Sequence, residues 1–135
     1  GIVIEHMELL PRFTARENLK LLARIRKTAS EEDIEEALKA VGLQQYADQK
    51  VKKFSLGMKQ RLNIAQAIFE KQKLILLDEP TNALDGQGVE QIYRLIKEQK
   101  ERGATVIIAT HHRQDLQELC DVVIELSKGK LIGNQ

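Results

Sequence analysis

The stretch LILLDEPTNALD, residues 74–85, decides the fold, because four apolar residues end abruptly in two adjacent carboxylates. Such a run predicts a strand that is buried on both faces, as in parallel sheets. Open α/β sheets bind ligands beyond the carboxyl ends of their strands. At that edge we expect Asp78 to hold a magnesium ion and Glu79 to polarise an attacking water. Taken alone, the same pattern also fits a strand that ends in a solvated acidic turn.

The residues after the two acids favour the first interpretation. Pro80 ends the strand, and turn or cap residues lead into a helix over about 86–102, whose apolar positions recur at helical spacing. The order DEPTNALD resembles the Walker B motif and D-loop of the ATP-binding-cassette (ABC) ATPases. The resemblance places Asp85 at the nucleotide site, where it links two subunits.

A second motif, FSLGMKQR at residues 54–61, resembles the ABC signature that is usually written LSGGQ. Ser55 is a good helix N-cap, and a helix that begins this way offers free N–H groups and a positive dipole end to an anion. Gly57 allows a close backbone approach that a β-carbon would block. The family usually has Gly at Leu56 and Gln at Met58. The resemblance implies that Ser55, Leu56, Gly57 and Met58 contact a nucleotide; an ordinary capped helix is the alternative.

The stretch TVIIATHH, residues 105–112, predicts a second buried strand, with His111 at its carboxyl end. His111 resembles the family's switch histidine, which contacts the γ-phosphate and helps to hold the attacking water. The alternative is a histidine that only makes structural hydrogen bonds. We expect His111 to lie in register with the two acids on the neighbouring strand, and we assign no role to His112 or His6.

Residues 1–19, GIVIEHMELLPRFTARENL, resemble the Q-loop of the family and the start of its helical subdomain. Glu5 stands where Gln is usual; it keeps an oxygen that can bind magnesium but adds a charge. Together with SLGMKQR, this Glu resembles the bacitracin and lantibiotic self-protection branch of bacterial ABC ATPases.

The sequence contains no Gly-x-x-x-x-Gly-Lys-Ser/Thr run, which would form the loop that cradles the phosphates. In family terms the chain starts just before the Q-loop, so we expect about a hundred preceding residues to be missing. The resemblance implies an α/β fold: the carboxyl-terminal part of a RecA-like P-loop NTPase core, with a mostly parallel sheet. Residues 14–61 would form an ABC-type helical subdomain that ends in the signature helix, and residues 62–135 the core.

Local signals place the remaining elements. Thr14 to Glu17 is a capping box that opens a helix to about Lys27, and Ser30 with Asp33 opens another. From residue 74, strands alternate with helices, which predicts a parallel sheet with crossover helices. The expected strands are 74–78, 104–109, 122–126 and about 130–132.

Composition narrows the class of protein. A net charge of +1 gives the chain no strong electrostatic attraction to nucleic acid or to an acidic membrane. The single cysteine, Cys120, excludes an intramolecular disulfide and suits a reducing cytoplasm. No apolar stretch is long enough to span a bilayer, so any membrane role must come through a partner.

Together these features predict the ATP-binding subunit of a bacterial ABC transporter, with ATP and Mg²⁺ as cofactors. The resemblance implies that two such subunits sandwich ATP, pair with transmembrane permease subunits and lie at the inner face of the cell membrane. The chain itself is expected to be inactive without the phosphate loop. Two alternatives remain: a soluble ABC ATPase of DNA maintenance, and a non-enzymatic module that keeps the fold without turnover.

Overall fold

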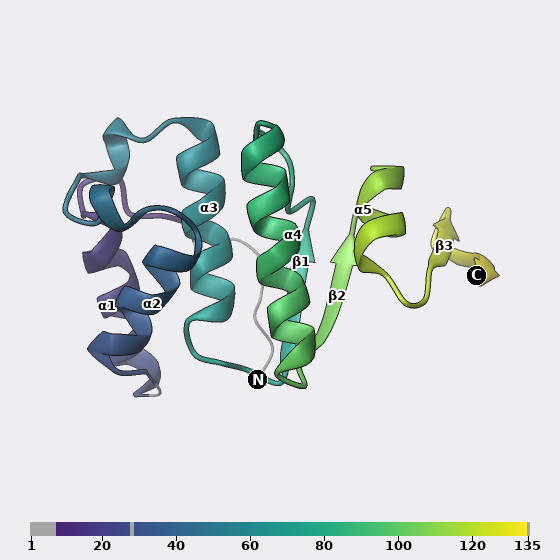
Figure 1. Cartoon of the computed structure of the whole chain (residues 1–135), viewed down its shortest axis with the longest axis horizontal. Helices are drawn as coiled ribbons and strands as arrows, with labels where there is room; N and C mark the ends of the chain where they lie inside the picture. Colours follow the sequence, from purple (N-terminus) through teal and green to yellow (C-terminus); the bar gives the residue numbers. More distant parts are fainter. Residues whose placement is uncertain (1–7, 28, 135) are drawn as a thin grey trace.

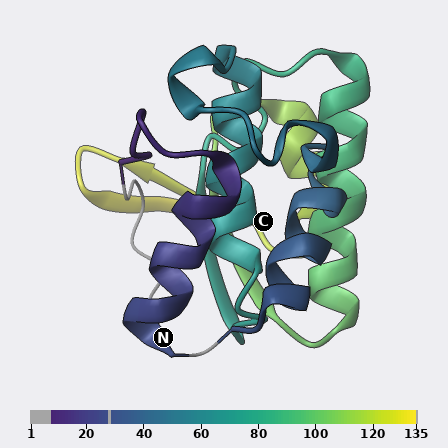
Figure 2. The same cartoon turned by 90° about the vertical axis from the view of Figure 1, so that its left-hand side faces the viewer.

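Helices make up the first half of the computed structural model, which describes residues 8–27 and 29–134 (Figures 1 and 2). Helices α1 (Ala15–Arg26) and α2 (Glu31–Ala40) both begin with capping boxes. The Thr14 hydroxyl accepts from the amide of Glu17, whose carboxylate accepts from the amide of Thr14 at 2.8 Å. Both predicted helix starts are therefore confirmed, because each satisfies two orphan amides locally.

The connection after α2 needs a residue in the left-handed backbone conformation, and Gly42 adopts it with φ of 74°. Its amide donates to the carbonyl of Lys39 and closes the last turn. The chain continues through two short 3₁₀ turns, η1 (Gln44–Tyr46) and η2 (Val51–Lys53). These turns bring it back past α1 to the next helix.

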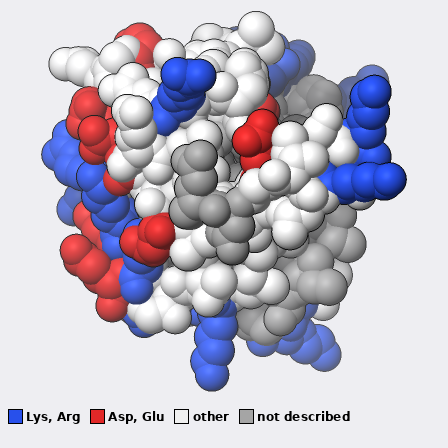
Figure 3. All heavy atoms as spheres, turned by 90° about the vertical axis from the view of Figure 1, so that its right-hand side faces the viewer, with Lys and Arg blue, Asp and Glu red and all other residues white. Residues whose placement is uncertain are grey.

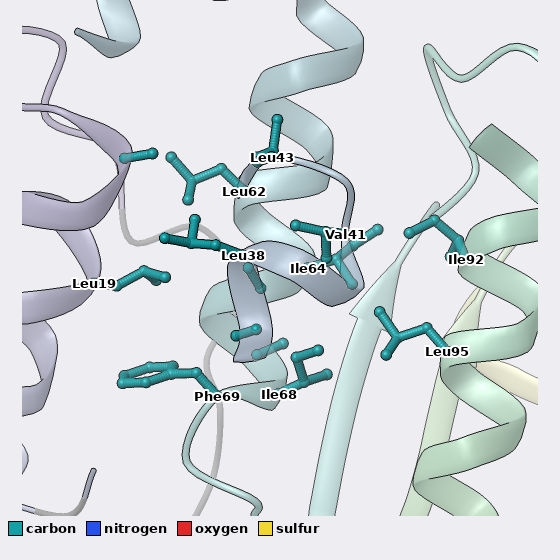
Figure 4. Packing of buried hydrophobic residues seen from close by; sticks show 14 of the residues in the cluster. Leu19, Leu38, Val41, Leu43, Leu62, Ile64, Ile68, Phe69, Ile92 and Leu95 are labelled. Carbon is teal, nitrogen blue, oxygen red and sulfur yellow. The ribbon is translucent and has the colours of Figure 1, made fainter. Parts of the chain in front are cut away.

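Helix α3 (Leu56–Ile68) lies at the centre of the core, packed against α2 and against strand β1 (Leu74–Asp78). Figure 4 shows its side chains meeting those of the neighbouring elements. Because α3 is covered from two directions, its buried residues are not confined to one face of the helix. The buried positions are Leu62, Ile64, Ala65, Ala67 and Ile68.

Strands β1 and β2 (Thr105–Ala109) form a parallel pair, joined by helix α4 (Gly86–Glu101). The register runs from Leu74 opposite Thr105 to Asp78 opposite Ala109. This is the crossover unit that the alternating pattern predicted. Parallel pairing places the carboxyl ends of both strands at one edge.

Strand β2 corrects one prediction, since it is not buried on both faces. Val106 and Ile108 rest against the core, but Ile107 on the opposite face is 55% exposed. Within residues 8–27 and 29–134, β2 pairs only with β1. Its apolar composition is that of a central strand, but no described strand covers its outer edge.

The last elements stand apart from this sheet. After helix α5 (Arg113–Leu119), strands β3 (Ile124–Ser127) and β4 (Lys130–Asn134) form an antiparallel hairpin (Figure 1). Lys128 and Gly129 turn the hairpin with φ of 48° and 73°, as a two-residue turn requires. In the described part of the chain β3 pairs with β4 alone, so it does not extend the parallel sheet as expected.

Apolar side chains are exposed around β2 and the hairpin, and much of this face carries no charged side chain (Figure 3). Leu126 is 70% exposed. The other large apolar residues exposed here are Ile107, Val122, Ile124, Leu131 and Ile132. A hairpin region that exposes this many large apolar side chains is unusual for a protein that stays monomeric.

We therefore expect the isolated chain to self-associate or to be loosely packed. Leaving about 300 Å² of apolar surface in water forfeits about 7 kcal/mol at ~25 cal/mol/Å², which is comparable with a whole domain's net stability of about 5–15 kcal/mol. Light scattering and binding of a hydrophobic dye measure both outcomes. The double substitution Ile124→Lys and Leu126→Lys should reduce association while leaving the helical circular dichroism intact. A compact monomer with a cooperative melt and no dye binding would contradict this expectation.

No helix within the described ranges combines the length and the apolar character needed to cross a bilayer.

Candidate functional site

The acids and the histidine meet at the carboxyl edge of β1 and β2. The amide of Glu79 donates to the carbonyl of Ala109 at 2.8 Å, which continues the strand pairing by one hydrogen bond. The register therefore places Glu79 beside Thr110 and His111. The prediction that His111 lies next to the acids across parallel strands is confirmed for Glu79.

The carboxylate of Glu79 is held by the residues that follow β2. His111 Nδ1 lies 2.7 Å from Glu79 Oε1, and the amide of His111 donates to the same oxygen at 3.2 Å. The Thr110 hydroxyl lies 3.3 Å from Glu79 Oε2. With Glu79 ionised, His111 Nδ1 carries the shared proton and Nε2 is left to face solvent. The contacts fix the direction of a carboxylate that is still one-quarter exposed.

The turn after β1 has a strained backbone. Glu79 and Ala83 are not glycines, yet they have φ of 46° and 63°. Such conformations cost about 1–3 kcal/mol each and cluster at functional sites. Gln60 of α3 braces the turn, because its Nε2 donates to the carbonyls of Glu79 and Pro80 at 3.0 and 3.1 Å. We did not predict this role for Gln60, since its partners lie far along the sequence.

A buried carboxylate accepts hydrogen bonds from residues at the same edge of the sheet. Asp115 in α5 is 1% exposed and accepts from three hydroxyl groups. Tyr93 donates at 2.7 Å, Thr81 at 2.9 Å, and Thr110 lies 2.9 Å from Oδ2. Burial, together with the hydrogen bond to Asp115, raises the pKa of Tyr93. The network links the turn after β1, α4, the end of β2 and α5.

Thr110 connects that network to Glu79. Its single hydroxyl proton is shared between Asp115 at 2.9 Å and Glu79 at 3.3 Å, so the shorter bond to Asp115 is favoured. The same oxygen accepts from the amide of His112 at 3.1 Å. Asp115 was not predicted, because an acid in a short helix carries no sequence signal of burial.

The signature-like segment begins α3 next to the strained turn. Ser55 caps the helix as predicted, since its hydroxyl accepts from the amide of Met58 at 3.2 Å. Leu56 is 75% exposed. A β-carbon on Gly57 would lie 2.9 Å from the carbonyl oxygen of Ala83. Glycine is therefore required here for the approach of the chain's own turn, whatever else binds at the helix start.

The other predicted site residues differ in how the structure places them. Asp85 caps α4, since its carboxylate accepts from the amide of Gly88 at 2.8 Å. Its predicted role between subunits stays a prediction. Asp78 ends β1 with an exposed side chain beside Glu79. Glu5 lies outside the described residues.

His112 joins the site although no role was predicted for it. Its Nε2 lies 3.0 Å from Asn82 Oδ1 and 3.7 Å from Glu79 Oε2. The rings of His111 and His112 are 4.2 Å apart. Two imidazoles and one carboxylate therefore share this edge of the sheet.

Comparison with known proteins agrees with the motifs. A family model described as "ABC transporter" matches residues 1–82. The ABC transporter ATP-binding protein YybJ of Bacillus subtilis is 53% identical over 131 residues, which are 97% of this chain and 60% of YybJ. The bacitracin transport ATP-binding protein BcrA of Bacillus licheniformis is 42% identical over 133 residues, 98% of this chain and 44% of BcrA. The chain thus spans about half the length of these relatives.

Solved structures show the same fold. The ATP-binding cassette MJ0796, described as a dimer in a post-hydrolysis state bound to ADP and Pi, matches with a TM-score of 0.87 and 30% identity. The match covers 98% of this chain and 60% of that one. An ATP-binding subunit of an ABC transporter matches with a TM-score of 0.85 and 27% identity over 98% of this chain and 57% of that one.

Proposed function

The chain belongs to the ABC transporter family of ATP-binding proteins, and from this we propose that it is the signature, Walker B, D-loop and switch-histidine part of a transport ATPase subunit. One observation carries the proposal. Glu79 and His111 are 2.7 Å apart at the carboxyl edge of β1 and β2, beside the exposed Asp78. A positioned carboxylate, a histidine and a further acid are what ATP hydrolysis needs on one side of the nucleotide.

In this proposal Glu79 is the general base and His111 senses the γ-phosphate. The hydrogen bonds from the amide and the ring of His111 orient the carboxylate before any water arrives. Magnesium fits Asp78, because an exposed carboxylate at a strand end is the hard oxygen donor that this ion prefers. Asp78 would hold the ion through water, with Glu5 as a further oxygen donor. When bound, magnesium neutralises charge on the phosphates.

The start of α3 is proposed to contact a nucleotide that is held mainly by a second subunit. Its first turn contains no acidic residue, so the positive end of the helix dipole is not neutralised. Ser55, Leu56, Gly57 and Met58 would form this surface. The exposure of Leu56 supports the proposal, since the segment points away from the chain's own core. Asp85 would link the two subunits near the same turn.

Transport is the proposed purpose of the hydrolysis. Bacitracin transport protein BcrA and lantibiotic transport protein SrtF of Streptococcus pyogenes are among the relatives, SrtF with 37% identity. We propose that the complete subunit acts on peptide antibiotics of this kind through transmembrane permease subunits. It would then lie in the cytoplasm, against the inner face of the membrane. Glu5 and the loop after it would report the nucleotide state to that partner.

The isolated chain is expected not to bind ATP–Mg²⁺ usefully, since a phosphate loop supplies most of the pre-organised donors in such sites. Calorimetry with ATP and magnesium should show no saturable heat. The control is a joined protein, in which this chain is fused to the part of YybJ that it does not span; this protein should bind. Micromolar affinity of the chain alone would contradict the expectation. A joined protein that folds but neither binds nor hydrolyses ATP would contradict the proposed function.

A further inference from the structure

Three side chains with metal-binding atoms converge on one point of the carboxyl edge. One coordinating atom from each of Glu79, His111 and His112 lies within 4.8 Å of the other two. His111 Nδ1 lies 2.7 Å from Glu79 Oε1, and His112 Nε2 lies 3.7 Å from Glu79 Oε2. In a tetrahedral zinc site with bonds of about 2.0–2.1 Å, ligand atoms lie about 3.4 Å apart. On binding, the cation replaces the proton that His111 Nδ1 shares with Glu79.

We propose that Glu79, His111 and His112 bind one divalent cation of the zinc type. The two imidazoles are borderline donors that favour zinc or cobalt over magnesium. Two imidazoles with one carboxylate are a ligand set that catalytic zinc sites use. Three protein ligands leave a fourth position for water, as in catalytic zinc sites. The site is chemically distinct from the proposed magnesium site at Asp78, which offers oxygen alone.

The surroundings hold the ligands close to their binding positions. His111 and His112 are consecutive residues, so the backbone fixes both rings beside Glu79. The His111 amide holds the carboxylate through a hydrogen bond of 3.2 Å. Hydrogen bonds of this kind orient ligands and raise metal affinity. Asn82 Oδ1 lies 3.0 Å from the same His112 nitrogen that must bind the cation, so the cation takes the place of that hydrogen bond.

Binding of zinc would also block the proposed chemistry, and this consequence rests on the proposed function. A cation that takes up the carboxylate of Glu79 removes the lone pair that would accept a proton from water. Zinc would then act as an inhibitor at the same edge where ATP is hydrolysed. The cation site itself does not depend on hydrolysis and is tested without it.

The test uses this chain alone, titrated with zinc by calorimetry in excess magnesium. We expect a single equivalent of zinc to bind and His112→Ala to weaken binding by at least about tenfold. The side chain of His112 is 42% exposed, so circular dichroism should show an unchanged fold. His6→Ala and Cys120→Ala are the matched controls, because the chain has three histidines and one cysteine. Neither control should change the affinity.

Cobalt provides a second readout that does not depend on a variant. A tetrahedral site gives strong visible absorption bands with Co²⁺, and zinc should abolish them. Absence of these bands, or equal zinc affinity in the parent and in His112→Ala, would overturn the proposed site. In the joined protein, zinc should inhibit hydrolysis in the parent much more than in His112→Ala. Tight zinc binding without inhibition would support the zinc site and refute the assignment of Glu79 as the general base.

Discussion

Glu79→Gln in the joined protein is expected to retain ATP binding and to slow hydrolysis by roughly 10²–10⁴, the usual contribution of a positioned base. Glutamine has the same shape, and its amide oxygen can accept from the backbone of His111 as the carboxylate does at 3.2 Å. The loss is therefore confined to the proton acceptor. Phosphate release under saturating ATP measures the turnover.

Because the substitution blocks the chemical step alone, ATP-bound dimers should accumulate, and size-exclusion chromatography with light scattering detects them. Glu101→Gln is the matched control, since Glu101 is an exposed acid in the last turn of α4. Its turnover should equal that of the parent. Hydrolysis by Glu79→Gln within a factor of about three of the parent would refute the base assignment.

Gly57→Asp should abolish hydrolysis while each subunit still binds ATP. The added carboxylate stands at the start of α3, where it repels phosphate groups and opposes the helix dipole. Sterics contribute as well, because a β-carbon at Gly57 meets the carbonyl oxygen of Ala83 at 2.9 Å and the turn must move. Hydrolysis and nucleotide binding are measured separately on the same preparation.

Two alanine variants separate charge from shape. Gly57→Ala adds only the β-carbon, so it should lose part of the activity through movement of the turn. Gly86→Ala is the control, because a β-carbon there meets no atom within 4 Å. It should leave turnover unchanged. Full hydrolysis by Gly57→Asp would remove the proposed contact between this helix and a nucleotide on the other subunit.

Much of the fold was readable from short-range patterns. The sequence predicted the capping boxes at Thr14 and Ser30, the N-cap Ser55 and the strand that ends at Asp78. The structure has each of them in its predicted place. Each depends on hydrogen bonds or periodicity within a few residues. Tertiary context could not easily override such signals.

The pairing of strands that lie far apart in the sequence was harder to predict. The apolar run at β2 was expected to be buried on both faces, but Ile107 is more than half exposed. The third strand was expected in the parallel sheet, but it pairs in a hairpin with β4. Strand composition reports the environment for which a strand is suited. It does not report which neighbours are present.

The residues of the site likewise fall into those that the sequence predicted and those that it did not. Glu79 and His111 were predicted because strand ends of a parallel sheet must meet at one edge, and motif order identified which ends these are. Gln60, Asp115 and His112 were not, since their roles depend on partners that lie close only after folding. No local sequence pattern shows that a glutamine supports a turn or that an aspartate is a buried hydrogen-bond acceptor. Likewise, no such pattern shows that a histidine is the proposed third ligand. All three residue types are more often solvated. The residue types and their order along the chain therefore determined the chemistry of this edge, while three-dimensional packing decided which side chains orient it.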